Sequence, residues 1–446
     1  MEIQTTKQRL KQYLFIIIIC LVMMIFGFAY SGFQETFAGF IRLTTGTDHL
    51  FTDYFVQGSI GSAFFNAALL GFIAIALLVI NKKDIDGMTI AGVFFFIGFA
   101  MFGKTIINTP PIILGVYIFS KVDKSKPFKD LLPAAFMGCT MAPAVSEVYF
   151  YNGLDPLAGI ILGVILGLFL GFVINPVAKV AFNFHKGYNL YNVGFAGGLI
   201  LTVVVSVLKV FGFEVKRQMM WYSEVNETLI WFTLFFFCYL CFYGLFYCLV
   251  HDDKNMIDRF ERIQVSDGVA PTDYVKSEGI GPVLLNMGFI GMISVCFTIF
   301  VQAPLNGPTI GTIISICGFG AAGKNIRGIC YIYLGALIGS WCGLWDLTQP
   351  SIIIGALFAT GLCPLAATYG PIVAIIATGL HLSVVQNTSD LHFGLNLYNN
   401  GFSCGLVALF IRGLLTSVHT KKGDFLIKHS KQYQLKLKEE QEQKEE

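Results

Sequence analysis

Two asparagine-containing stretches of the chain carry the residue types that could handle a polar solute. Residues 185–199 read HKGYNLYNVGFAGGL and residues 392–406 read HFGLNLYNNGFSCGL, and ten of the fifteen positions are identical without a gap. Each copy offers an imidazole that could move a proton, amides and a phenol that could form hydrogen bonds, and glycines that permit close backbone approach. The residues of interest are His185, Asn189, Tyr191 and Asn192, with their copies His392, Asn396, Tyr398 and Asn399.

These polar residues stand in strongly apolar surroundings. Of the 446 residues, 55% are hydrophobic and 13% are charged, and the mean hydropathy is +0.68, whereas soluble domains carry about 25% charged residues. Apolar runs near the ~20 residues that span a bilayer follow one another. The composition predicts an all-α, polytopic membrane protein whose main partner is the lipid bilayer. A net charge of +2 argues against nucleic acid, and the cysteines show no metal-site spacing, so we expect no cofactor or metal.

A longer repeat divides the chain into two halves. Residues 42–115 align with residues 262–335 at an offset of 220 without a gap, and twenty of seventy-four positions match. The matches include polar residues that unrelated apolar helices would not share by chance: Asp53 with Asp273, Asn66 with Asn286, and Lys104 with Lys324. The sequence therefore predicts two homologous repeats, residues 1–222 and 223–419, followed by a charged tail at 420–446.

Each half offers seven candidate membrane spans. In the first half they are residues 14–30, 57–80, 87–103, 106–121, 130–150, 157–177 and 190–212. In the second half they are residues 226–250, 279–302, 308–323, 326–344, 347–366, 370–386 and 396–418. Because seven is odd, the halves should have opposite orientations.

The distribution of lysine and arginine sets the predicted orientation. Placing both termini and the connector 252–278 in the cytoplasm puts most of these residues inside, as the positive-inside rule requires. We therefore expect a multi-pass protein of the cytoplasmic membrane. Whether segments 87–121 and 190–212 cross fully or re-enter stays open, and so does homo-oligomerisation.

Two interpretations of the asparagines stay open. An unpaired polar group in hydrocarbon costs several kcal/mol, so Asn189, Asn192, Asn396 and Asn399 could hold broken helices together by capping and interhelical hydrogen bonds. They could instead line a polar pathway at the membrane midplane, where interrupted helices point their N-termini at a solute. A related pattern of asparagine with glycine five residues later holds for Asn66, Asn192 and Asn286, whereas Asn399 has Cys404 there and Gly405 next. Each half thus carries this pattern twice, which adds Asn66 and Asn286 to the set.

The ionisable residues also allow two roles each. His185 and His392 could anchor the helices at the membrane edge or relay protons. Glu147 lies in a predicted span without an acidic copy in the second half, so it is a candidate proton or coupling-ion site.

Lys104 and Lys324 each follow a glycine at the end of a predicted span, and Asp53 and Asp273 precede the preceding span on the same side. We expect a structural Lys–Asp pair in each half, with binding of an anion by the lysines as the alternative.

At the GYNLYNVGFAGGL and FFNAALLGF runs the chain resembles a family of uncharacterised bacterial multi-pass membrane proteins grouped as a domain of unknown function. That resemblance covers nearly the whole chain and implies a membrane protein without implying an activity. More locally, residues 187–189 and 66–71 are similar to short runs of urea channels, which are also built from inverted halves. The urea-channel run Leu-Pro-x-x-Thr-x-Pro-Phe is missing here.

The sequence therefore favours a transporter that moves a small polar or ionic solute, with or without a coupling ion, between inverted repeats. A channel for a small neutral solute is the second hypothesis, because it needs the same polar lining but no coupling ion. A membrane-embedded lipid-processing enzyme is the third. Paired carboxylates, HExxH, GxSxG and Walker-type loops do not occur in a usable context, so we do not expect an enzyme.

Overall fold

The computed structural model describes residues 5–213, 219–251 and 255–417, and the regular elements in these ranges are helices, with one isolated β-bridge between Thr52 and Met220. The first half contains α1 (Thr6–Gln12), α2 (Leu14–Thr44), α3 (Tyr54–Gln57), α4 (Ile60–Ile80), α5 (Gly87–Phe99), α6 (Pro110–Val122), α7 (Phe128–Gly138), η1 (Cys139–Met141), α8 (Ala142–Tyr149), α9 (Pro156–His185) and α10 (Asn192–Val210). The predicted tail 420–446 lies outside the described residues.

The second half repeats this order. It contains α11 (Glu227–Val250), α12 (Met256–Val265), α13 (Tyr274–Glu278), α14 (Ile280–Phe300), α15 (Gly307–Gly318), η2 (Phe319–Ala321), α16 (Ile326–Trp341), α17 (Pro350–Phe358), η3 (Ala359–Leu362), α18 (Cys363–Tyr369), α19 (Pro371–Thr388), η4 (Ser389–His392) and α20 (Asn399–Ser417). The polar connector 252–278 is itself partly helical, because it contains α12 and α13.

Helices occupy all fourteen predicted ranges, but they differ in length. In the described part of the chain, nine helical segments are long and apolar enough to cross a membrane. The segments at Gly87–Phe99, Pro110–Val122, Gly307–Ala321 and Ile326–Trp341 are apolar but shorter. At a rise of 1.5 Å per residue, the 13-residue helices α5 and α6 are each about 20 Å long, which is less than the ~30 Å hydrocarbon core. Segment 87–121 is therefore two short helices joined by an irregular stretch.

The sequence explains why these helices stop. After α5 and α15 the chain passes through Gly103 and Gly323, whose φ angles are +144° and +114°, a region that L-residues with side chains rarely adopt. The breaks between α7 and α8 and between α17 and α18 each lie just before a proline in the first turn of the next helix. Proline cannot supply the backbone N–H that would continue the preceding helix, but it suits a helix start.

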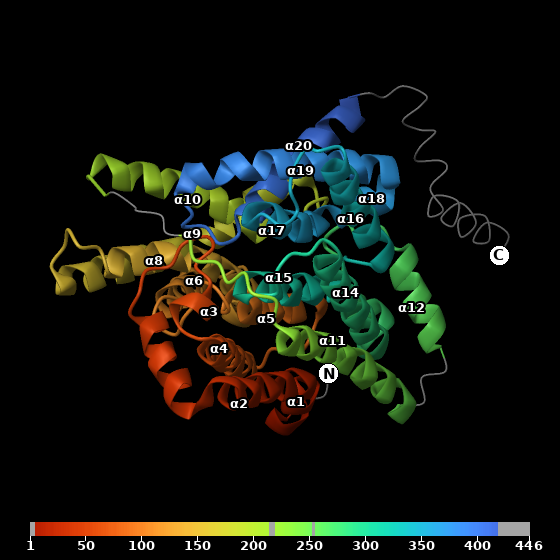
Figure 1. The fold of residues 1–446 in the computed structure, drawn as a ribbon, viewed down its shortest axis with the longest axis horizontal. Helices are drawn as coiled ribbons and strands as arrows, with labels where there is room; N and C mark the ends of the chain where they lie inside the picture. Colours follow the sequence, from red (N-terminus) through yellow and green to blue (C-terminus); the bar gives the residue numbers. More distant parts are fainter. Residues whose placement is uncertain (1–4, 214–218, 252–254, 418–446) are drawn as a thin grey trace.

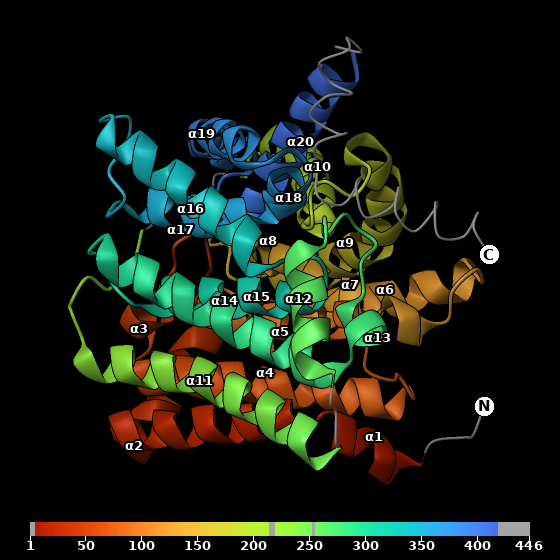
Figure 2. The ribbon, with the colours of Figure 1, turned by 90° about the vertical axis from the view of Figure 1, so that its right-hand side faces the viewer.

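The short helices α5 and α15 lie at the centre of the molecule in both ribbon views (Figures 1 and 2). Helices α2, α4, α11 and α14 lie on one side of them, and α10, α19 and α20 lie on the opposite side (Figures 1 and 2). The two central helices run antiparallel, because Gly98 near the end of α5 meets Gly311 near the start of α15, while Gly318 near the end of α15 meets Ala91 in α5. The fold thus puts two interrupted helices at its core.

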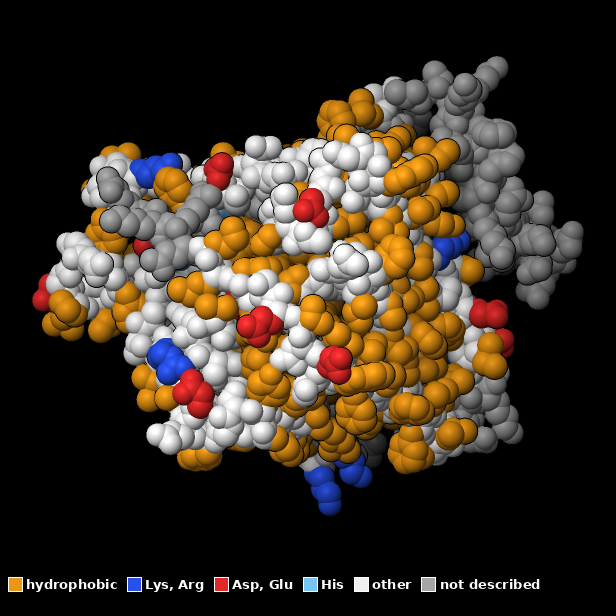
Figure 3. Space-filling model, in the orientation of Figure 1, with side chains coloured by type: hydrophobic (Ala, Val, Ile, Leu, Met, Phe, Trp, Pro, Cys, Tyr) orange, Lys and Arg blue, Asp and Glu red, His pale blue; other side chains and the backbone are white. Residues whose placement is uncertain are grey.

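Many hydrophobic side chains lie on the surface of the molecule. Figure 3 shows a broad, nearly continuous area of them on one face, with few charged groups. Soluble monomers rarely expose apolar patches larger than a few hundred Å². Together with the nine long apolar helices, this surface indicates a membrane protein whose lipid-facing side is apolar.

Candidate functional site

The two copies of the asparagine motif lie against each other where α10 and α20 begin. A Cβ added to Gly401 would lie 2.8 Å from the Cα of Gly194, so the backbones touch and only glycine fits. The rings of Phe195 and Phe402 stack with centroids 5.9 Å apart. Because both contacts join positions that are equivalent in the two copies, the copies meet around a shared centre (Figure 2).

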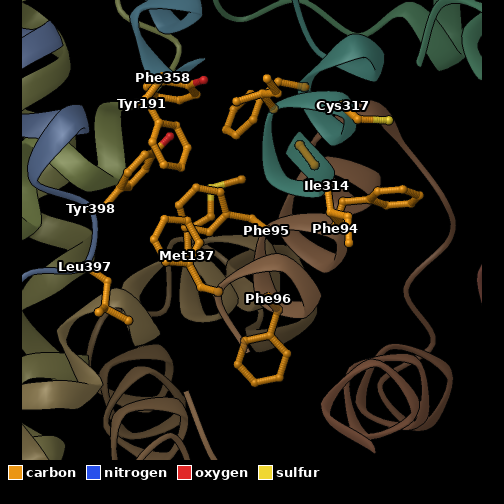
Figure 4. Close-up of a cluster of buried hydrophobic side chains, with 14 of the residues drawn as sticks. Phe94, Phe95, Phe96, Met137, Tyr191, Ile314, Cys317, Phe358, Leu397 and Tyr398 are labelled. Atoms are coloured by element: carbon orange, nitrogen blue, oxygen red, sulfur yellow. The ribbon is translucent and has the colours of Figure 1, made fainter. Parts of the chain in front are cut away.

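Aromatic rings surround this meeting point. The ring centroids of Tyr191 and Tyr398 are 4.9 Å apart, and Phe95 of α5 lies 4.3 Å from Tyr398. Phe358, at the end of α17, lies 5.7 Å from Tyr191 and 5.5 Å from Tyr398. Figure 4 shows these four side chains together in the buried core. The site therefore joins α5, α10, α17 and α20.

Lys324 reaches this cluster from the loop after η2. Its Nζ donates hydrogen bonds to the hydroxyl of Tyr191 and to Oγ1 of Thr360, the latter at 2.7 Å. The ammonium also lies 4.7 Å from the centroid of the Tyr191 ring, within the range of a cation–π interaction. All three side chains are buried. The hydrogen-bond partners of Lys324 thus come from both halves of the protein.

Lys104, the copy of Lys324, is equally buried but has different partners. Its Nζ donates to the backbone oxygen of Phe136 at 3.0 Å. The rings of Phe95, Phe96 and Phe99 surround it with centroids between 5.0 and 5.2 Å away. Among the described residues, neither lysine forms an ion pair with an acidic side chain. The predicted structural Lys–Asp pairs are therefore absent, because the lysines point into the aromatic core.

The two aspartates instead bind the starts of the short helices. Asp53 Oδ1 accepts the N–H of Gly307, the first residue of α15, at 3.2 Å. Asp273 Oδ1 accepts the N–H of Gly87, the first residue of α5, at 2.9 Å. Each aspartate therefore stabilises the positive end of a helix that belongs to the other half.

Asn66 and Asn286 hold the segments that follow the short helices. Nδ2 of Asn66 donates to the backbone oxygens of Ala100 and Lys104, both at 2.7 Å. Nδ2 of Asn286 makes the equivalent bonds to Gly320 and Lys324 at 2.8 and 2.9 Å. These asparagines satisfy carbonyl groups that the helix break leaves without helical partners, so they position the two lysines.

In each copy, the histidine and the second asparagine form a hydrogen-bonded pair, which we call the clasp. Nε2 of His185 lies 2.9 Å from Oδ1 of Asn192, whose Nδ2 donates to the Ala178 oxygen at 2.9 Å. His392 and Asn399 repeat this arrangement, at 3.2 and 3.1 Å. The clasp ties the end of one helix to the start of the next, and it uses the amide groups of Asn192 and Asn399 within the protein.

The first asparagine of each copy behaves differently in the two halves. Oδ1 of Asn189 accepts the N–H of Tyr191, and Oδ1 of Asn396 accepts that of Tyr398, so each forms a local turn just before its helix begins. Nδ2 of Asn189 donates to the Gly401 oxygen at 3.3 Å. The buried Nδ2 of Asn396 has no hydrogen-bond partner. Buried polar groups are rarely left without partners, so this amide differs from its copy in the first half.

Glu147 belongs to a separate polar cluster at one end of the core. Its Oε2 lies 3.1 Å from Nε2 of His49. The neighbouring Asp48 accepts hydrogen bonds from Tyr54, Asn108 and Ser146. Burial raises the pKa of Asp48 to about 7, although the hydrogen bonds from Tyr54 and Ser146 act in the opposite direction. Asp48 can therefore bind or release a proton near neutral pH, but it has no acidic equivalent in the second half, where residue 268 is glycine.

Sequence reasoning missed four of these polar residues. Thr140 and Thr360 are each the second residue of a short 3₁₀ segment that interrupts a helix pair. They match at the same offset of 220 as the lysines, so extending the repeat alignment past residue 115 would have found them. Asp48 and His49 have no repeated partner, and only their contacts with α8 and with Glu147 reveal them.

The chain belongs to the family described as protein of unknown function (DUF1576), whose model matches residues 33–210 and 252–417. These two ranges contain the central helices α5 and α15, both copies of the asparagine motif and both lysines. The family description assigns no activity, substrate or partner. No curated protein matches the chain.

Proposed function

We propose that this member of the DUF1576 family is an integral membrane transporter that moves a small polar or ionic solute through a site between two inverted repeats. The observation that carries the proposal is the pair of completely buried lysines, Lys104 and Lys324. Ionisable groups inside a membrane protein are rare and usually mark a transport pathway or a relay. Here they follow two interrupted helices, which is where secondary transporters bind their solutes.

Contacts between the two halves support inverted repeats, because they occur twice with the roles of the halves exchanged. The antiparallel crossing of α5 and α15 is what two oppositely oriented copies of one helix would form. The exchange of helix-start aspartates between the halves has the same two-fold character. Opposite orientations would let one group of helices rock against the other, so that the site opens first to one side and then to the other.

We favour a carrier over a channel for a neutral solute. Neither lysine is exposed to solvent, which fits an occluded state of a carrier better than an open pore. The asymmetric cluster of Asp48, His49 and Glu147 is our candidate for coupling transport to protons. The positive-inside pattern supports a cytoplasmic membrane location with both termini inside.

The test is uptake into proteoliposomes made from the purified, full-length protein. Radiolabelled small carboxylates, amino acids, inorganic phosphate and urea would be offered with and without a proton gradient. We expect saturable uptake of at least one solute above empty liposomes, and a fall of about tenfold or more in a Tyr191→Phe, Lys324→Met variant that loses the buried hydrogen bonds.

A carrier predicts saturation and stimulation by the gradient. Fast, non-saturating flux of urea that ignores the gradient would instead establish a channel. Uptake that is unchanged in the folded variant would show that the lysine cluster is not part of the pathway.

A further inference from the structure

The two lysine clusters are equivalent in sequence, and the second-half cluster shows what such a cluster needs. Lys324 donates to Tyr191 and to Thr360, Thr360 also donates to the Leu357 oxygen at 2.7 Å, and Asn189 donates to the Gly401 oxygen. Every one of these polar groups therefore has a partner within the protein.

The first-half cluster lacks these partners. Its matching residues are Lys104, Thr140, Asn396 and Tyr398, and all four are buried. Oγ1 of Thr140, Nδ2 of Asn396 and the hydroxyl of Tyr398 have no hydrogen-bond partner. Leaving a buried polar group without a partner is unfavourable, so three of them together are unexpected unless a ligand completes the site.

The four residues lie close together. The N–H of Leu397, between Asn396 and Tyr398, donates to the Thr140 oxygen at 3.1 Å. A Cβ at Gly103, the residue before Lys104, would lie 2.6 Å from the Leu397 side chain. The ring of Phe95 lies 5.0 Å from Lys104 Nζ and 4.3 Å from the Tyr398 ring, so it links the lysine to the tyrosine.

The chemistry of these groups selects an anion. An ammonium group and an amide Nδ2 can only donate hydrogen bonds, and the two hydroxyl groups can also donate. No acidic side chain among the described residues pairs with Lys104, and a buried charge is tolerated when it is paired. The starts of the 19-residue helices α10 and α20 meet beside these residues, and helix N-termini favour negative charge.

The apolar side chains around the four residues determine which kind of anion fits. The rings of Phe95, Phe96 and Phe99 enclose the Lys104 ammonium, and Leu397 is buried beside them. A phosphate dianion would lose more hydration here than a singly charged group, and it would find only apolar contacts beyond the four donors. A carboxylate with a short hydrocarbon part suits both the donors and these apolar side chains.

We propose that Lys104, Thr140, Asn396 and Tyr398 form a binding site for a small organic monocarboxylate. This inference rests on the proposed function, because it names the solute class for the same pathway. It also makes the two halves unequal: the first-half lysine binds the solute, while the second-half lysine is held by Tyr191 and Thr360.

The binding test measures thermal unfolding of the purified, full-length protein in detergent at constant ionic strength. Sodium acetate and sodium butyrate are the probes, acetamide and butyramide are their uncharged counterparts of similar shape, and sodium phosphate tests the rival anion. We expect a saturable rise in the unfolding temperature with the carboxylates and no rise with the amides. In Tyr398→Phe and in Lys104→Met, the apparent affinity for acetate should fall about tenfold or more.

The control is Tyr13→Phe, which removes the hydroxyl of another buried tyrosine, one that donates to the Lys83 oxygen, and it should keep the carboxylate effect within about threefold. Equal effects of acetate and acetamide, no effect of either, or a larger effect of phosphate would overturn the inference. So would a loss of the carboxylate effect in Tyr13→Phe but not in Tyr398→Phe. If Lys104→Met does not fold, Tyr398→Phe still decides the question.

Uptake measurements separate this inference from the proposed function. Proteoliposomes that take up a neutral or cationic solute, while the purified protein ignores carboxylates, would refute the carboxylate site and leave transport standing. A protein that binds acetate but moves no carboxylate across the liposome membrane would keep the site and refute transport.

Discussion

The carboxylate of Asp53 accepts a hydrogen bond from the N–H of Gly307, 254 residues further along the chain, at 3.2 Å. The reciprocal contact joins Asp273 to Gly87 at 2.9 Å. Each half of the protein thus holds the start of the other half's short central helix. These contacts tie the two repeats together at the place where the interrupted helices enter the core.

Removing one of these carboxylates should destabilise the fold without abolishing it. For Asp273→Ala we expect a loss of about 1–2 kcal/mol, the usual effect of losing a helix-start acceptor, seen as a lower midpoint of thermal unfolding in detergent. Lys276→Ala is the matched control, because it removes the exposed Lys276–Asp273 ion pair but leaves the acceptor. If Lys276→Ala destabilised the protein as much as Asp273→Ala, the ion pair would be the stabilising contact.

The crossing of α5 and α15 depends on Gly98 and Gly311. A Cβ on either glycine would lie 2.2 Å from the backbone oxygen of the other, so even Gly98→Ala must separate the helices. We expect this variant to lose most of its folded, monodisperse protein in size-exclusion chromatography. Gly413→Ala is the control, since a Cβ there would meet nothing within 4 Å. Normal behaviour of both variants would mean that the central helices are loosely packed.

The clasp and the proposed pathway predict different phenotypes for two asparagines of the same motif. Asn192→Ala breaks the bonds to His185 and to the Ala178 oxygen, so we expect lower thermal stability of about 1–3 kcal/mol with solute affinity retained. Asn396→Ala removes an amide whose Nδ2 has no partner and whose Oδ1 accepts only the N–H of Tyr398, so it should lower stability less than Asn192→Ala does and should lose affinity. The check is the unfolding midpoint with and without sodium acetate, and the reverse pattern would assign the roles the other way round.

Inverted repeats predict that equivalent positions lie on opposite sides of the membrane. Cys342, just after α16, is exposed, and residue 122, its equivalent at the offset of 220, ends α6. In intact cells, a membrane-impermeant maleimide should label Cys342 from outside. In a Cys342→Ser background, Val122→Cys should be labelled only after the membrane is permeabilised. Labelling of both positions from one side would establish parallel repeats.

The polar cluster around Asp48 predicts a pH dependence of stability. Burial raises the pKa of this carboxyl to about 7 from 3.8, so the folded state binds the proton more tightly than the unfolded state. The contribution of Asp48 to the free energy of unfolding is therefore complete below about pH 4 and is lost as the pH rises through about 7. We expect the unfolding temperature to fall over that window in the native protein, and to fall less in Asp48→Asn.

Asp346→Asn is the control for this pH dependence, because Asp346 is exposed in the loop before α17. It should leave the slope of unfolding temperature against pH unchanged. A slope that is the same in the native protein and in Asp48→Asn would assign the proton exchange to other groups, with His49 and Glu147 the nearest to test.

Much of the architecture could be predicted because it depends on composition and on local periodicity. An apolar run near ~20 residues must bury its backbone in a helix when it enters lipid, so the all-α class and the positions of the helices followed from residue types alone. The two repeats were equally visible, since matches such as Asn66 with Asn286 and Lys104 with Lys324 do not arise from shared hydrophobicity. The sequence placed both lysines only at the ends of predicted spans, whereas the structure buries them in the core.

The partners of these residues were decided by the tertiary structure. Lys104 and Asp53 looked like an ion pair because they end and begin neighbouring segments on one side, but Lys104 points into a cage of phenylalanines and Asp53 reaches the other repeat. A duplicated sequence states which residues are equivalent, not which copy touches which. Contacts across more than a hundred residues, such as Lys324 with Tyr191, exist only after the halves pack against each other. The packing of the halves also decides that one lysine cluster has hydrogen-bond partners for its polar groups and the other does not. Identical residues acquire different neighbours when two copies share one core.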